Sequence, residues 1–97
     1  MTTLTRLEGD ALRQAIEALP AGWGFQQGPD RIVKQWSFDD FKAAMTFVNK
    51  AADVAEAQNH HPDIRIVYNR VGLVLTTHDA KGLTQRDLDF VSTLENI

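Results

Sequence analysis

The sequence of 97 residues contains no cysteine. Disulfide bonds, thiolate metal sites and a thiol nucleophile are therefore all excluded. The chain also has no run of Lys or Arg, and its formal net charge at pH 7 is -3. Nonspecific nucleic-acid binding requires a basic surface that releases counterions from phosphates. We therefore expect no direct contact with nucleic acid.

No stretch is long and apolar enough to cross a bilayer, and residues 1–10 lack the apolar core of an export signal. Internal repeats and low-complexity segments are also missing. The hydrophobic share of 43% and the charged share of 24% are typical of soluble globular proteins. We expect one cytoplasmic domain over residues 1–97 with no membrane partner. A chain of this length has a thin core, so oligomerisation is expected to add buried surface.

The apolar pattern predicts an α+β domain with the element order α-β-β-α-β-β-α. Its first half contains a helix over residues 10–19 that ends before Pro20, and a hairpin of residues 23–27 and 31–36 around Gly28-Pro29-Asp30. An antiparallel four-stranded sheet with helices on one face is the expected architecture.

A long helix is predicted between Ser37 and Asn59, before Pro62 prevents continuation. Ser37 is its predicted N-cap, with Asp40 at the third helical position and a Trp36/Phe41 hydrophobic staple. Apolar residues recur at steps of three and four along the face predicted to be buried, namely Phe38, Phe41, Met45, Val48, Ala52 and Ala55.

The last predicted helix follows Thr84, which we expect to be its N-cap, with Asp87 reaching back in a capping box and a Leu83/Leu88 staple. Its predicted inward residues are Leu88, Val91, Leu94 and Ile97.

Alternation of apolar residues predicts two strands before this helix, over residues 64–68 and 71–75. If Asn69 and Arg70 form the turn, Tyr68 faces Val71, and the apolar pairs Ile66–Leu73 and Ile64–Leu75 follow on one face. On the other face this register pairs His61 with His78, whose Cβ atoms would then lie ~5 Å apart. His60 lies at a junction, so it either turns toward the same pocket or, under strict alternation, points to the other face.

Imidazoles change protonation state near neutral pH, so converging histidines can supply both a general acid and a general base. A single histidine at the end of an element more often caps or bonds locally. A histidine-only zinc site is the alternative, but adjacent His60 and His61 do not aim easily at one ion, and stoichiometric zinc binding would reverse this judgement. Glu56 either orients one histidine or is a solvated helix carboxylate. Nucleophile-elbow and dinucleotide-binding motifs are missing.

Several segments together resemble the pterin-4a-carbinolamine dehydratases. The resemblance lies in Glu56-Ala57-Gln58-Asn59-His60-His61-Pro62-Asp63, Tyr68, Thr76-Thr77-His78 and Asp87, and extends to Trp36-Ser37-Phe38-Asp39-Asp40-Phe41 and Gly82-Leu83-Thr84. It covers nearly the whole chain without a departure at these positions. It implies a four-stranded antiparallel sheet with helices on one face.

The resemblance also implies an enzyme that dehydrates 4a-hydroxytetrahydropterin to quinonoid dihydropterin, without metal or organic cofactor, and regenerates the cofactor spent by aromatic amino-acid hydroxylases. It implies that His60, His61 and His78 line the pterin pocket. Asn59, Thr76, Thr77 and Asp79 are the implied polar contacts to the ring. Homodimers or homotetramers are common in the family. Some relatives are also dimerisation cofactors of a transcription factor, so a protein-binding module is the second hypothesis.

Overall fold

The computed structural model describes residues 5–97, which form three α-helices, a four-stranded sheet and one short 3-10 helix. In chain order the elements are α1 (Gly9–Glu17), β1 (Gly24–Gln26), β2 (Arg31–Ser37), α2 (Phe41–Gln58), β3 (Asp63–Val67), β4 (Arg70–Leu75), η1 (His78–Ala80) and α3 (Gln85–Glu95). The predicted α+β class and order are confirmed, and only η1 was not predicted. Residues 1–4 of the predicted domain lie outside the described residues. Within residues 5–97, no helix is both long and apolar enough to span a membrane.

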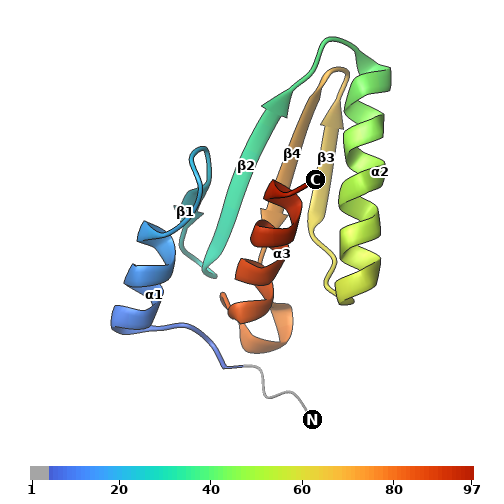
Figure 1. Cartoon of the computed structure of the whole chain (residues 1–97). Helices are drawn as coiled ribbons and strands as arrows, with labels where there is room; N and C mark the ends of the chain where they lie inside the picture. Colours follow the sequence, from blue (N-terminus) through green and yellow to red (C-terminus); the bar gives the residue numbers. More distant parts are fainter. Residues whose placement is uncertain (1–4) are drawn as a thin grey trace.

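The sheet has the strand order β1-β2-β4-β3, with antiparallel pairing throughout (Figure 1). In Figure 1, α3 lies across the sheet and α2 runs alongside β3 and β4. Their buried side chains form one core with those of the two central strands. The core comprises Ile32, Ala44, Val48, Ala51, Val54, Ala55, Val71, Leu73, Leu75, Leu83, Phe90, Val91 and Leu94. The alternation predicted for the strands thus places one face of the sheet under the helices.

The β3–β4 hairpin has a different register from the predicted one. Its turn residues are Tyr68 and Asn69, and Val67 pairs with Arg70. Ile66 therefore faces Val71 rather than Leu73, which is a shift of two residues that keeps the side chains of the paired residues on their predicted faces. The predicted inward position of Tyr68 is wrong, because this residue lies in the turn and is 64% exposed.

Contacts with the preceding loop explain why this turn falls one residue earlier than predicted. Asn69 Nδ2 donates to the carbonyl of Phe38, and the Phe38 amide donates to the carbonyl of Asn69, both at 2.8 Å. Tyr68 has a φ of 50°. The favoured two-residue hairpin turns require a positive φ at their first central residue. Tertiary docking of Asn69 therefore determines the register.

The start of α2 also corrects the sequence prediction. Ser37 is the last residue of β2, where it pairs with Arg70, so it is not the N-cap. Asp40 is the N-cap instead, and its Oδ1 accepts from the amide of Ala43 at 2.8 Å. Phe41 becomes the first helical residue and is 50% exposed. The predicted Trp36/Phe41 staple is therefore wrong, and the buried stripe is rotated toward Ala44, Ala51 and Val54.

The capping box predicted for α3 is confirmed. Thr84 is the N-cap, and the side chain of Asp87 accepts from the Thr84 amide at 3.0 Å. Phe90, which the sequence prediction missed, is fully buried, whereas Ile97 is 53% exposed and its predicted inward position is wrong. The buried face of α3 consists of Asp87, Phe90, Val91 and Leu94. It differs from the predicted face because the buried carboxylate of Asp87 belongs to the packed side of the helix.

Truncating Phe90 is expected to destabilise the fold far more than truncating Ile97. Phe90→Ala leaves a cavity in the core and should cost about 3–5 kcal/mol, whereas Ile97→Ala removes exposed surface and should cost less than about 1 kcal/mol. Urea unfolding of the two variants beside the parent chain measures the difference. Equal losses for the two variants would contradict the packing described for α3.

A polar and aromatic cluster joins the end of α3 to the first hairpin. Glu95 Oε1 accepts from Trp23 Nε1 at 2.9 Å and from Lys34 Nζ at 3.0 Å. The ammonium group of Lys34 also lies 5.2 Å from the ring centroid of Trp36. The hydrogen bonds from Trp23 and Lys34 lower the pKa of Glu95 below its usual value of 4.5.

Because this pKa is lowered by folding, the carboxylate of Glu95 stabilises the fold above its unfolded-state pKa, and the stabilisation is lost as the pH falls through the folded-state pKa. Glu95→Gln should therefore be less stable than the parent at about pH 7, by ~1 kcal/mol or less for this partly exposed group. The difference should shrink below about pH 4. Urea unfolding at both pH values, with the exposed Glu17→Gln as control, measures it; a difference that grows on acidification contradicts the assignment.

Candidate active site

The two adjacent histidines diverge because α2 ends in a left-handed residue. Asn59 has a φ of 48° and ψ of 45°, and its amide bonds back to carbonyls of the last helical turn. Residues 60–62 then connect α2 to β3 outside any helix or strand. His60 is buried, with 7% of its surface exposed, whereas the side chain of His61 is 58% exposed. The two adjacent side chains therefore lie in different surroundings, as expected from the predicted alternative in which His60 points away from His61.

Arg86, on the first turn of α3, holds the end of α2 in place. Its Nη2 donates to the carbonyls of Gln58 and Asn59 at 3.2 and 2.5 Å. These carbonyls belong to the final turn of the helix, whose acceptors have no partner within the helix. A cationic donor therefore satisfies them and fixes the segment that carries both histidines.

The buried carboxylate of Asp87 connects three separate segments. Its Oδ1 lies 2.6 Å from His60 Nε2, and its Oδ2 lies 2.8 Å from Thr77 Oγ1 and 3.0 Å from the Thr84 amide. Asp87 itself has no exposed surface. A buried carboxylate is tolerated where several donors surround it. The capping role predicted for Asp87 is confirmed, and its bond to His60 is an additional contact that sequence reasoning missed.

His61 bonds to Glu56, the carboxylate that sequence analysis considered as an orienting group. Its Nε2 lies 2.6 Å from Glu56 Oε2, with both side chains largely exposed. Glu56 belongs to the last turn of α2, so the left-handed end of the helix brings His61 back beside it. Glu56 is thus both bonded to a histidine and largely exposed to solvent.

His78 lies at the start of η1 and is exposed. It directly follows Thr77, so the bond from Thr77 to Asp87 ties its segment to the one that carries His60 and His61. Thr76 Oγ1 donates to the carbonyl of Asp30 at 2.8 Å, and Asp79 is exposed within η1.

The predicted cross-strand pairing of His61 with His78 is wrong. β3 begins at Asp63 and β4 ends at Leu75, so both histidines lie outside the paired strands. Extending the observed register would place position 61 opposite position 76. No hydrogen bond within residues 5–97 joins two histidines, and no group of three His, Asp or Glu residues there has a metal-binding arrangement.

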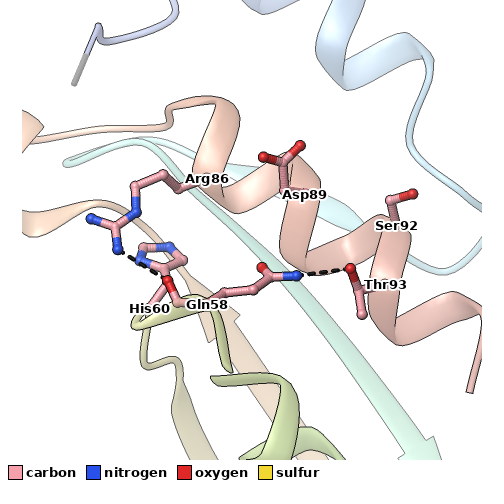
Figure 2. A pocket seen from close by; sticks show the side chains of 6 residues that line it. All are labelled: Gln58, His60, Arg86, Asp89, Ser92 and Thr93. Atoms are coloured by element: carbon pink, nitrogen blue, oxygen red, sulfur yellow. Dashed lines mark hydrogen bonds between the residues drawn. The ribbon is translucent and has the colours of Figure 1, made fainter. Parts of the chain in front are cut away.

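A cleft of about 500 Å³ opens beside His60 between the end of α2 and the outer side of α3 (Figure 2). Its lining is polar and comprises Gln58, His60, Arg86, Asp89, Ser92 and Thr93. Figure 2 shows Gln58 reaching across the cleft to Thr93, where its Nε2 donates to Oγ1 at 2.8 Å. The cleft and the role of Arg86 were not predicted. The first-turn position of Arg86 gave no signal, since its partners are backbone carbonyls of another helix.

The chain matches the family model described as "Pterin 4 alpha carbinolamine dehydratase" over residues 5–97. A protein of Acidobacterium capsulatum, provisionally named as a pterin-4-alpha-carbinolamine dehydratase, is 48% identical over 93 residues, which cover 95% of this chain and 97% of that protein. A similarly named protein of Rhodopseudomonas palustris is 44% identical over 92 residues, 95% of this chain and 90% of that one.

Solved structures are similar as well. The crystal structure of a transcriptional coactivator/pterin dehydratase from Brucella melitensis has a TM-score of 0.86 at 34% identity, covering 95% of this chain and 97% of that chain. A pterin dehydratase-like RuBisCO assembly factor of the alpha-carboxysome has a TM-score of 0.66 at 18% identity, covers 77% of this chain and 87% of that one, and shares the fold alone. The match over residues 5–97 and the identities of the relatives show that the chain belongs to the pterin 4 alpha carbinolamine dehydratase family.

Proposed function

We propose that this chain dehydrates 4a-hydroxytetrahydropterin to quinonoid dihydropterin, with His60, His61 and His78 as its acid/base groups. Family membership supports the reaction. The observation that carries the histidine proposal is the junction at Asp87, which ties the segment of His60 and His61 to the segment of His78. The observed register does not pair His61 with His78, whereas the junction at Asp87 provides a separate reason to group the three residues.

The proposed reaction needs two proton movements and no redox step. A general acid protonates the 4a-hydroxyl group, which leaves as water when its bond to C4a breaks. A general base removes the hydrogen from N5, and the remaining electron pair forms the bond between N5 and C4a. Imidazoles suit both tasks near neutral pH. His61 and His78 are exposed and can meet a ligand that arrives from solvent.

The polar residues around this junction differ in their present contacts: Asn59 and Asp79 are exposed, whereas the hydroxyl of Thr76 donates to the carbonyl of Asp30 and keeps only its lone pairs for a ligand. We propose Asn59, Thr76 and Asp79 as contacts to the pterin ring, and Glu56 as the group that orients His61. Thr77, the other predicted ring contact, uses its hydroxyl for Asp87 and its amide for the carbonyl of Gly82.

We place the reaction in the recycling of a reduced pterin cofactor after an aromatic amino-acid hydroxylase has used it, in a homodimer or homotetramer. A second role in binding a transcription factor is suggested only by the coactivator named with the Brucella melitensis structure. The clustered titratable groups favour catalysis, because a scaffold has no physical need for them. A His60, His61 and His78 triple variant should lose dehydration while retaining any scaffolding.

Replacing His61 tests the proposed chemistry. His61→Ala should lower the dehydration rate by ~10²-fold or more, the usual scale for one general acid/base group, while the fold survives because the side chain is exposed. The measurement is the loss of 4a-hydroxytetrahydropterin followed by absorbance, with spontaneous dehydration subtracted.

Asn49→Ala, an exposed change on α2, is the matched control and should retain the parent rate. Far-ultraviolet circular dichroism should be the same for both variants. An unchanged rate for His61→Ala would remove His61 from the mechanism, and no acceleration by the parent chain would refute the proposed function.

A further inference from the structure

We propose that Thr84 and Thr77 are positioning residues that act through Asp87 on His60. They hold its imidazole with the hydrogen on Nε2 and leave Nδ1 as a hydrogen-bond acceptor facing the cleft of Figure 2. The catalytic consequence rests on the proposed function, whereas the ring state is a property of the folded chain and can be measured without substrate.

A backbone donor at one end of this network fixes which hydroxyl donates and which accepts in each hydrogen bond. The Arg86 amide donates to Thr84 Oγ1 at 3.2 Å, and Thr84 Oγ1 lies 2.8 Å from Thr77 Oγ1. Each hydroxyl has one hydrogen to donate. If Thr77 donated its hydrogen to Thr84, the hydroxyl hydrogen of Thr84 would have no acceptor in this buried network. Thr77 would then have no hydrogen left to donate to Asp87. Thr84 therefore donates to Thr77, and Thr77 donates to Asp87.

The donors that meet Asp87 determine which nitrogen of His60 carries the hydrogen. Asp87 Oδ2 accepts from the hydroxyl of Thr77 and from the Thr84 amide, which leaves Oδ1 for the imidazole. These two donors favour the ionised form of the carboxyl group, and an ionised carboxyl group only accepts hydrogen bonds. His60 Nε2, 2.6 Å from Oδ1, is consequently the donor. The hydrogen bond made by one ring nitrogen sets the state of the other, so Nδ1 of the neutral ring carries a lone pair.

The free nitrogen of His60 is accessible. Within residues 5–97, no fully buried side-chain nitrogen or oxygen lacks a hydrogen-bond partner. The side-chain hydrogen bond of His60 uses Nε2 alone, so Nδ1 retains some exposed surface. His60 lines the cleft beside Arg86 and Gln58 (Figure 2). We therefore assign Nδ1 as the atom that His60 presents to a ligand, which suits it to accept a hydrogen rather than to donate one.

The test compares two replacements of Thr77. Thr77→Val removes the hydroxyl at nearly constant shape, whereas Thr77→Ser keeps it. Nitrogen-15 NMR of histidine-labelled protein, at a pH where the imidazoles are neutral, reports which ring nitrogen carries hydrogen. His61→Ala and His78→Ala spectra assign the His60 signals. The parent and Thr77→Ser should show hydrogen on Nε2, and Thr77→Val should show a mixture. Hydrogen on Nδ1 in the parent, or an unchanged ring in Thr77→Val, overturns the proposal.

Kinetics separate a positioning role from a merely structural one. Thr77→Val should lower kcat by ~10-fold, the lower end of the scale found for outer groups that orient metal-ligating histidines. KM should be nearly unchanged, and Thr77→Ser should restore kcat. Thr46→Val, an exposed threonine on α2, should match the parent. Thermal unfolding curves identify a temperature at which all variants are folded, and the kinetics are compared at that temperature.

The two proposals fail in different ways. If the ring state changes in Thr77→Val while kcat is unchanged, the catalytic part of the inference is refuted. If the ring state is as expected but the parent chain does not accelerate dehydration, the proposed function fails and the positioning network stands. A fall in kcat without a change in the ring state refutes positioning by Thr77.

Discussion

The carboxylate of Asp87 is the interaction on which the remainder of the site depends. It is fully buried, and it accepts hydrogens from the start of its own helix, from the segment after β4 and from His60. Removing one partner of a buried, hydrogen-bonded charge typically costs about 3–5 kcal/mol, so these segments are strongly coupled. The residue that completes the capping box of α3 therefore also positions the end of α2 and the start of η1.

Adjacent histidines acquire different environments from one local feature of the backbone. The left-handed conformation of Asn59 ends α2, and beyond it His60 is buried while His61 is exposed. Each then meets its own carboxylate, Asp87 for the buried ring and Glu56 for the exposed one. A dipeptide of identical residues thus supplies one immobilised imidazole and one that solvent can reach.

The element order, the buried face of β4 and the capping box of α3 could be predicted because each depends on residues close in sequence. The β3–β4 register could not, since docking of Asn69 onto Phe38 selects the turn. The N-cap of α2 was wrong for a similar reason: Ser37 pairs with Arg70 and extends β2. The histidines were identified from the sequence by residue type and family resemblance, but their predicted pairing depended on the register and was wrong.

Capping and site geometry are linked here because Thr84 has two functions in one network. As the N-cap it accepts from the Arg86 amide, and as a donor it can pass its hydrogen only toward Thr77. Arg86 in turn uses its guanidinium for the carbonyls at the end of α2. The first turn of α3 therefore supplies both the support for the histidine-bearing segment and the direction of the bonds that reach His60. A sequence motif for starting a helix is, in this fold, also part of the architecture of the site.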